Sequence, residues 1–243
     1  MKIAVIIPTY NESGSIREVV EEIYQSVRAE TNHEWHVLIV DANSPDGTAE
    51  IIRTITGTFP TLHLIVESEK RGLALAYSTG IDHAINRLGA EAFIEFDGDG
   101  QHDPQDIPRL VSALMSGADV VIGSRYVSGG SVPSAWARPR KFLSRFGSLY
   151  TRFLLQLPVH DATSGLKVTR IKPYGELLPY LPEQLLTSHY AYKIQFLFNL
   201  HQQGARIIEI PITFRLREHD VSKSTWRDII ESLRVTTILR WRS

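Results

Sequence analysis

The segment AFIEFDGDGQHDP, residues 92–104, decides how the rest of the chain is interpreted. Its first five residues are apolar apart from one glutamate, which predicts a short buried strand. Pro104, with Asp103 as its cap, predicts the start of a helix. Asp97 and Asp99 therefore lie at the carboxyl end of a strand, where open α/β sheets bind their ligands. Two carboxylates this close repel each other unless a cation is near, so the segment predicts either a metal site or an ordinary polar turn.

The next residues add further donor atoms. Gln101 supplies an amide oxygen and His102 an imidazole. Mg²⁺ and Mn²⁺ prefer oxygen ligands and usually bind through one or two carboxylates together with substrate phosphates. Glycine on both sides of Asp99 lets a phosphate approach the backbone. The functional interpretation is therefore a Mg²⁺ or Mn²⁺ ion that binds together with a phosphorylated substrate.

Strand-like apolar runs and amphipathic helix-like runs alternate along the first half of the chain. This alternation predicts an α/β fold with a mainly parallel sheet and right-handed crossovers. The sequence contains no Gly-x-Gly-x-x-Gly turn after the first strand and no Gly-Lys-Ser/Thr phosphate loop, so neither a dinucleotide enzyme nor an ordinary ATPase is supported. The less regular second half predicts a helix, a strand pair and a final helix in the same domain. The predicted strands are residues 3–7, 35–40, 62–66, 92–96 and 119–123.

Composition excludes several classes of protein. A formal net charge of −1 argues against a general nucleic-acid binder. The 243 residues include no cysteine, which excludes disulfides, thiolate catalysis and zinc–thiolate sites and leaves a reducing cytoplasm as the default location. No stretch reaches the roughly 18 uninterrupted apolar residues of a spanning helix, and the first residues lack the features of a signal peptide. We expect a cytoplasmic protein that is at most attached to a membrane surface.

Polar residues also follow two other predicted strands. Asp41 ends the second strand, and Pro-Thr-Tyr-Asn-Glu at residues 8–12 follows the first. On a parallel sheet these ends line one crevice. A carboxylate there can accept hydrogen bonds from a base or a ribose, although Asp41 and Asp46 could instead shape an Asx turn before a helix. Three acidic strand ends on one sheet edge favour a nucleoside diphosphate held with a metal.

Six motifs together carry a resemblance that covers residues 3–224. They are Pro8-Thr9-Tyr10-Asn11-Glu12, Asp41 to Thr48, Arg71-Gly72-Leu73, Asp97 to His102, Gly123-Ser124-Arg125-Tyr126 and Asp161-Ala162-Thr163-Ser164-Gly165. Each motif is weak alone, but the ordered series resembles family 2 glycosyltransferases, specifically dolichol-phosphate mannosyltransferases and their bacterial polyprenyl-phosphate relatives. The resemblance implies a GT-A fold, an Asp-x-Asp metal site with Mg²⁺ or Mn²⁺, a nucleotide-sugar donor with GDP-mannose favoured, a polyprenyl phosphate acceptor and inversion at the anomeric carbon.

The resemblance also implies three groups of site residues. The donor would be bound by Pro8, Tyr10, Glu12, Asp41, Asp97, Gly98, Lys193, Arg217 and Lys223. The metal ligands would be Asp97, Asp99 and Gln101, and the acceptor phosphate would be bound by Arg125, Arg140 and Ser144. Asp99 and Arg125 are the expected catalytic residues. Because the acceptor phosphate is already an anion near neutral pH, no general base is expected.

Some positions depart from the family pattern. Gln195 stands where the family often has Glu, Leu216 and Asp220 where it often has Asp and Gly, and Ala42 where a second Asp is common. These departures leave the sugar open. The alternatives are a glucosyl or N-acetylhexosaminyl transferase that uses a UDP-sugar, an acceptor that is not a lipid, and a catalytically inactive nucleotide-sugar-binding partner subunit.

Two segments have the pattern of amphipathic helices with basic flanks. Phe142, Phe146, Leu149 and Phe153 repeat at helical spacing between Arg and Lys residues. Such a stripe predicts either an interfacial membrane helix or a helix that packs on the core. The final segment has the same character, so we expect a catalytic domain over residues 1–224, an amphipathic helix over residues 225–243 and peripheral association with the cytoplasmic face of a membrane.

Overall fold

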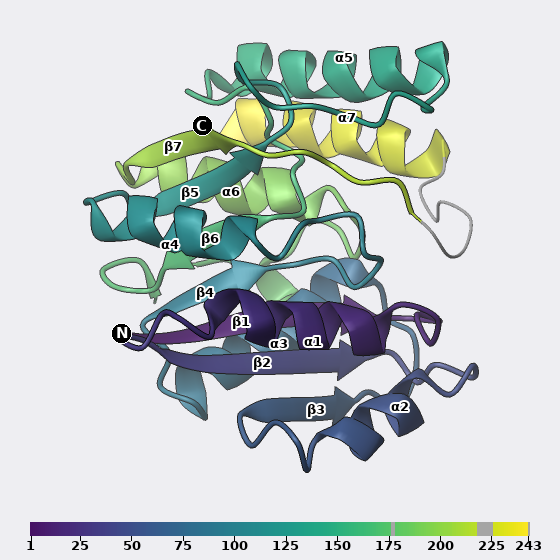
Figure 1. The fold of residues 1–243 in the computed structure, drawn as a ribbon. Coiled ribbons are helices and arrows are strands. Elements are labelled where there is room, and N and C mark those ends of the chain that lie inside the picture. Colours follow the sequence, from purple (N-terminus) through teal and green to yellow (C-terminus); the bar gives the residue numbers. More distant parts are fainter. Residues whose placement is uncertain (176–177, 218–225, 243) are drawn as a thin grey trace.

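The computed structural model describes residues 1–175, 178–217 and 226–242 and places a seven-stranded sheet between two layers of helices (Figure 1). The strands are β1 (Lys2–Thr9), β2 (Glu34–Asp41), β3 (Leu62–Val66), β4 (Ala92–Glu95), β5 (Val120–Ser124), β6 (Lys167–Arg170) and β7 (Ile207–Pro211). The helices are α1 (Ile16–Val27), α2 (Thr48–Ile55), α3 (Leu73–Asn86), α4 (Asp106–Met115), α5 (Arg138–Leu155), the short 3-10 helix η2 (Pro182–Gln184), α6 (Tyr192–Gln202) and α7 (Trp226–Arg242).

The strand order is β3-β2-β1-β4-β6-β5-β7. The pairs β1–β2, β1–β4, β2–β3 and β5–β7 are parallel, so the predicted mainly parallel α/β sheet is confirmed. The predicted strand pair in the second half is wrong, because β6 and β7 do not pair with each other. After α5 the chain returns as β6 between β4 and β5, antiparallel to both, and β7 then joins the far edge of β5.

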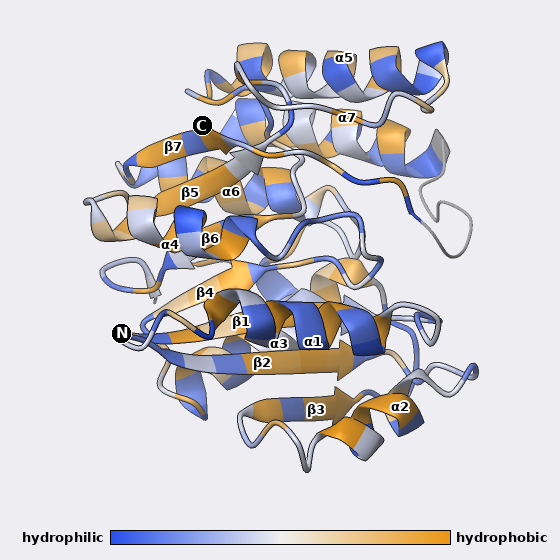
Figure 2. Ribbon diagram, viewed as in Figure 1, coloured by the Kyte–Doolittle hydropathy of each residue, from blue (hydrophilic) through white to orange (hydrophobic). Residues whose placement is uncertain are grey.

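Alternating side chains of the central strands supply both cores. Ala4 and Ile6 face a cluster that includes α3, α6 and α7, while Ile3, Val5 and Ile7 face a second cluster that includes α1 and α4. Figure 2 shows the central strands as predominantly hydrophobic, as expected for a sheet covered on both faces.

The segment after β4 differs locally from the prediction. Helix α4 begins at Asp106, and Asp103 does not cap it. Instead, the Asp103 carboxylate accepts a hydrogen bond from the backbone N–H of Gln105 at 2.9 Å, which is an Asx turn. The hydroxyl of Ser15, just before α1, donates to the carbonyl of Gly98 at 2.9 Å and ties α1 to this turn.

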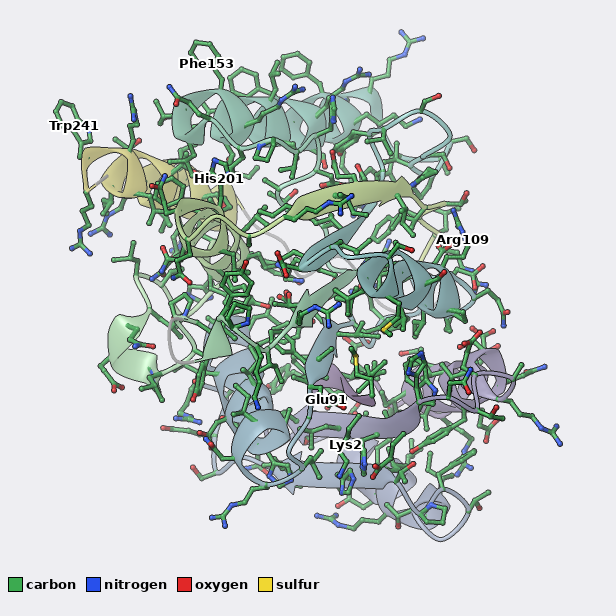
Figure 3. All side chains as sticks on the ribbon, turned by 90° about the vertical axis from the view of Figure 1, so that its left-hand side faces the viewer. Lys2, Glu91, Arg109, Phe153, His201 and Trp241 are labelled. Carbon is green, nitrogen blue, oxygen red and sulfur yellow. The ribbon has the colours of Figure 1, made fainter. Side chains whose placement is uncertain are left out.

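Helices α5 and α7 lie side by side at the end of the molecule that carries β5 and β7 (Figure 1). Val235 and Leu239 of α7 are buried in the same core as α3 and α6. In contrast, Phe153 of α5 and Trp241 of α7 are 83% and 86% exposed and point away from the body (Figure 3). Among the residues described, no helix is long and apolar enough to cross a membrane.

Candidate functional site

A cavity of about 960 Å³ lies at the carboxyl ends of β1 and β4. Its walls come from the end of β1, the turn after β4, the entry to α3, the loop before α6 and the first turns of α7. The polar and charged lining residues are Thr9, Tyr10, Glu12, Lys70, Arg71, Asp97, Asp99, Ser188, His189, Tyr190, Arg217, Arg227, Asp228, Glu231 and Arg234. The predicted crevice at the strand ends therefore exists, and it contains both central aspartates.

Asp97 is held by three side chains from the interior. Its Oδ1 accepts a hydrogen bond from the Tyr77 hydroxyl at 3.1 Å and lies 3.3 Å from the Lys193 ammonium, and its Oδ2 lies 3.5 Å from Nε2 of His102. Burial alone would raise the pKa of Asp97, but Lys193 and then His102 hold that pKa well below its ordinary value. The carboxylate is therefore ionised at neutral pH. The backbone of Gly165 passes so close that a Cβ there would lie 2.0 Å from Oδ2 of Asp97.

Asp99 has a different partner. It forms an ion pair with the guanidinium of Arg217, which follows β7 and also lines the cavity. Burial alone would lower the pKa of Arg217, but the Asp99 carboxylate raises this pKa above its ordinary value. Gln101 turns back from the cavity, because its backbone N–H donates to Asp99 at 3.1 Å and its side-chain amide donates to the carbonyl of Arg215 at 3.2 Å.

These residues fit a divalent cation. The carboxylates of Asp97 and Asp99 are hard oxygen donors that line one cavity. Each forms an ion pair with a cationic side chain of the protein. Asp97 and Asp99 could hold Mg²⁺ or Mn²⁺ once Arg217 moves aside. The side-chain oxygen of Gln101 could join them only if its amide left Arg215.

The part of the cavity wall that follows β1 combines an aromatic ring with a cation. The Lys70 ammonium lies 3.8 Å from the centre of the Tyr10 ring, and Pro8 and Glu12 line the same wall. Asp41, however, is fully buried and accepts hydrogen bonds from the hydroxyls of Thr9 and Ser44 at 2.8 and 2.6 Å. Asp41 also accepts a hydrogen bond from the backbone N–H of Ser44 at 2.8 Å and so holds the turn before α2, in which Asp46 forms an Asx turn with the backbone N–H of Thr48 at 3.1 Å. Asp41 is absent from the cavity lining among the described residues.

The predicted acceptor cations have unequal surroundings. Arg125 is buried and donates two parallel hydrogen bonds of 2.7 Å to Asp161, which is also buried. Arg140 is more exposed and lies 3.9 Å over the ring of Trp136. Partial burial, followed by the nearby charges of Arg217 and Arg125, lowers the pKa of Arg140, so these cations lie close together.

The other predicted residues divide as follows. The Ser144 hydroxyl lies 2.5 Å from the Tyr126 hydroxyl on the side of α5 that faces the body. Lys193 is buried against Asp97 and, among the described residues, is not part of the cavity wall. Lys223 and Asp220 lie outside the described residues. Gln195 points away from the site. Its side-chain amide donates to the carbonyl of Gln184 at 2.7 Å and accepts from the backbone N–H of Leu186 at 2.8 Å.

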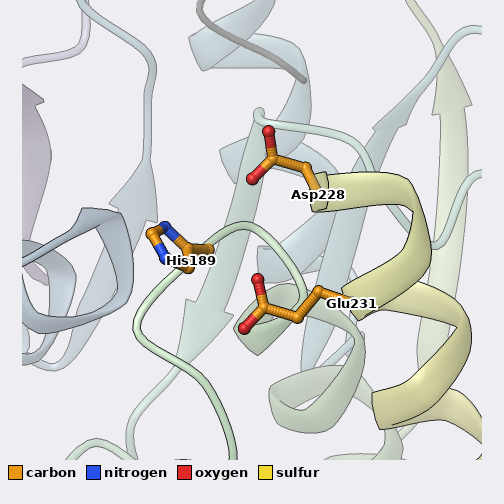
Figure 4. A group of neighbouring side chains, drawn as sticks. All are labelled: His189, Asp228 and Glu231. Carbon is orange, nitrogen blue, oxygen red and sulfur yellow. The ribbon is translucent and has the colours of Figure 1, made fainter. Parts of the chain in front are cut away.

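Sequence reasoning missed two groups in the cavity wall. Arg71 belongs to the motif Arg71-Gly72-Leu73, for which the resemblance implies no site role, and Lys70 directly precedes that motif. His189, Asp228 and Glu231 form a cluster across the cavity, in which the two acids from α7 face the histidine from the loop before α6 (Figure 4). The i, i+3 spacing of the two acids on α7 is visible in the sequence, but the approach of His189 depends on tertiary packing.

Comparison with known proteins identifies the group to which this chain belongs. The model of Glycosyl transferase family 2 matches residues 4–178. Polyprenol monophosphomannose synthase of Mycolicibacterium smegmatis is 36% identical over 231 residues, which is 94% of this chain and 83% of that protein. Undecaprenyl-phosphate mannosyltransferase of Micrococcus luteus is 36% identical over 242 residues, covering 99% of this chain and 94% of that protein.

Solved structures support the same fold. A mannosyltransferase from Pyrobaculum calidifontis, in complex with GDP-Man and Mn²⁺, matches 99% of this chain and 64% of its own, with a TM-score of 0.64 and 23% identity. Mannosyl-3-phosphoglycerate synthase from Rubrobacter xylanophilus matches with a TM-score of 0.69 and 15% identity over all of this chain and 73% of that one. The predicted GT-A fold is confirmed. The chain therefore belongs to glycosyltransferase family 2 and is a glycosyltransferase.

Proposed function

We propose that this enzyme transfers mannose, with inversion, from a nucleoside diphosphate to a polyprenyl phosphate, and that GDP-mannose is the donor. The observation that carries the proposal is the placement of two carboxylates, Asp97 and Asp99, in one cavity, where Arg217 is ion-paired with Asp99. The two relatives at 36% identity, which span nearly the whole chain, are named for mannosyl transfer to polyprenyl phosphates.

The cavity offers aromatic, acidic and basic groups to a nucleotide-sugar donor. Pro8, Tyr10 and Glu12 would contact the nucleoside, with Lys70 above the Tyr10 ring. Asp41 would act through the turn that it holds. Asp97, Asp99 and, after rotation, Gln101 would hold the Mg²⁺ or Mn²⁺, with Gly98 leaving space for the phosphates. The metal would stabilise charge on the departing diphosphate.

Arg217 would leave its ion pair with Asp99 and bind the donor phosphates instead. An arginine suits this role because its planar guanidinium binds phosphate oxygens in a bidentate manner. Lys223 is proposed to join it from the segment outside the described residues. Lys193 would act on the donor only through Asp97, because the ammonium is buried behind that carboxylate.

The acceptor phosphate would enter from the side of α5. Arg140, which is more exposed than Arg125, would bind it directly together with Ser144. Arg125 would add positive potential from its buried pair with Asp161. An oxygen of the acceptor phosphate forms the new bond to the anomeric carbon as the bond to the diphosphate breaks, and no proton has to be removed.

The lipid tail of the acceptor would also account for the exposed apolar stripe on the outer face of α5. Phe142, Phe146, Leu149 and Phe153 are exposed on one stripe, among Arg and Lys residues. We propose that this face and the exposed end of α7 lie on the cytoplasmic surface of a membrane, as expected for an enzyme whose acceptor keeps its tail in the bilayer. The catalytic domain is proposed to span residues 1–224, with residues 225–243 as an amphipathic helix that packs on it.

A transfer assay tests the proposal. Radiolabelled GDP-mannose, UDP-glucose and UDP-N-acetylglucosamine are each incubated with a short polyprenyl phosphate, with Mn²⁺ or Mg²⁺ or with a chelator. We expect metal-dependent label in the lipid from GDP-mannose, and at least about a hundredfold less with Asp99→Asn, since charge stabilisation of the leaving group is lost.

Transfer from a UDP-sugar instead would support the glucosyl or N-acetylhexosaminyl alternative. Tight donor binding without transfer to any acceptor would support the inactive partner subunit. Gln195 is one of the departures behind that alternative. Its side chain joins Gln184 and Leu186 by hydrogen bonds and is not among the described residues that line the cavity.

A further inference from the structure

The two aspartates of the proposed metal site are compensated by cations of different kinds. Asp99 pairs with Arg217, which lines the cavity and directly precedes the segment outside the described residues. Asp97 pairs with Lys193, a residue of α6 whose side chain is only 2% exposed. Arg217 thus lies in the cavity wall, whereas Lys193 lies behind Asp97 in the protein interior.

Lys193 belongs to a balanced layer of buried charge. Beneath it, the Lys167 ammonium lies 2.7 Å from Glu95, and Glu95 also accepts a hydrogen bond from the Tyr192 hydroxyl. Burial lowers the pKa of Lys167 below its ordinary value. The charges of Glu95 and Asp97 oppose this shift, and the charge of Lys193 adds to it. Lys167 and Lys193 thus oppose Glu95 and Asp97, and the layer is close to neutral without any metal.

A balanced layer changes the conditions under which a divalent cation can bind. An ion bound at Asp97 alone would add two positive charges beside an ammonium that cannot move into water. Isolated buried charge is strongly unfavourable. The negative diphosphate of a nucleotide donor would offset this imbalance, so a metal and a nucleotide would each favour binding of the other.

We infer that Lys193 is a positioning residue that sets the charge of the metal site, so that the cation binds strongly only together with the nucleotide. This inference rests on the proposed assignment of Asp97 and Asp99 as metal ligands, and it gives a role to a side chain that does not reach the donor. The Tyr77 hydroxyl, which donates to the same oxygen of Asp97, positions that carboxylate without adding charge.

Lys193 and Tyr77 therefore provide a matched pair of variants. Both side chains are buried, and both contact Oδ1 of Asp97, but only one is charged. Lys193→Gln removes the charge and keeps a group that can donate to Asp97. Tyr77→Phe removes a hydrogen bond and keeps the charge. Lys193→Met serves as a second neutral variant if the glutamine variant does not fold.

The experiment measures Mn²⁺ binding by calorimetry and by electron paramagnetic resonance of free Mn²⁺, with and without GDP, on variants whose folding is verified by circular dichroism. For the wild type we expect weak Mn²⁺ binding alone and strong binding with GDP. In Lys193→Gln, Mn²⁺ affinity without GDP should rise about tenfold or more, because one positive charge near the ion is lost. The gain produced by GDP should shrink, and Tyr77→Phe should show no such rise.

Two results overturn the inference. One is an unchanged or weaker Mn²⁺ affinity in folded Lys193→Gln without GDP, and the other is an equal rise in Tyr77→Phe. A different result would contradict the proposed function itself: if the wild type binds no Mn²⁺ even with GDP, Asp97 and Asp99 are not metal ligands.

Discussion

At the scale of single residues, pairs of opposite charge organise this site. Asp97 with Lys193, Asp99 with Arg217 and Asp161 with Arg125 each join residues far apart in the sequence. Burial makes such pairs sensitive to the loss of one partner, because the remaining charge is left without compensation. Exposed pairs such as Arg53 with Glu50 on α2 contribute much less.

The pair of Asp161 and Arg125 gives a prediction for stability. Asp161→Asn leaves the Arg125 guanidinium buried without a counterion, and should lower the free energy of unfolding by about 3–5 kcal/mol at pH 7. Glu50→Gln, which breaks an exposed pair, should change it by less than about 1 kcal/mol. Urea unfolding followed by circular dichroism measures both. Equal small losses in the two variants would mean that the buried pair contributes no special stability.

The same pair predicts a pH dependence. Burial would raise the pKa of Asp161, but Arg125 lowers it below the ordinary value. An acid whose pKa is lower in the folded state stabilises the fold fully above its unfolded pKa, about 3.9 for Asp, and this stabilisation is lost as the pH falls through the folded pKa. The difference between wild type and Asp161→Asn should therefore be constant from pH 7 to about 5 and shrink below about 4. A difference that grows on acidification would contradict this assignment.

These partners mark the limit of what the sequence reveals about single residues. The aspartates after β4 were predicted to share one sheet edge with residues 8–12, and they do so. Lys193 was predicted to contact the donor, but its place on the inner face of α6 turns it towards Asp97. Asp41 was predicted to face the ligand or to hold an Asx turn, and only the structure shows that its carboxylate is buried in the turn.

At the scale of the elements, α5 has two faces with different environments. Ser148 and Thr151 are buried towards the body, whereas the Phe and Leu stripe is exposed. The sequence stripe allowed both a membrane face and a core face, because periodicity shows that a helix has an apolar side but not what covers it. Packing shows that the aromatic stripe of α5 is left uncovered by the described part of the chain.

Phe146→Glu tests the membrane role of this stripe. Phe146 is 47% exposed, so the variant should fold, while its binding to liposomes that contain anionic lipid should weaken. Each basic residue near an anionic leaflet contributes about 1 kcal/mol, screened by salt, so high salt should weaken wild-type binding as well. The measurement is co-sedimentation with liposomes, followed by transfer to a long-chain acceptor in liposomes and to a soluble short-chain acceptor.

Met115→Glu is the matched control, since Met115 is 52% exposed at the end of α4. It should leave liposome binding unchanged. Phe146→Glu should reduce transfer to the long-chain lipid far more than transfer to the soluble acceptor. An equal loss on both acceptors would show that Phe146 supports the fold and does not contact the bilayer.

At the scale of the whole molecule, the sheet topology brings the site together. The first four parallel strands were predicted from their apolar runs, with ends correct to within two residues, because buried strands have a clear sequence pattern. The insertion of β6 between β4 and β5 was not predicted, since pairing between distant strands leaves no local signal. That insertion carries Gly165 over Asp97 and sets Asp161 against Arg125. Helix α7 lines the cavity with its first turns, and α5 packs against α7.

One measurement tests the central claim most directly. GDP-mannose labelled with ¹³C at the anomeric carbon is incubated with the enzyme, Mn²⁺ and a short polyprenyl phosphate, and the anomeric signal is followed by nuclear magnetic resonance. We predict that the α-mannosyl signal of the donor is replaced by a β-mannosyl phosphate signal coupled to the phosphorus of the lipid, and that Asp99→Asn prevents this change. A donor signal that persists, turns into free mannose, or gives an α-linked product would contradict inverting transfer of mannose to a polyprenyl phosphate.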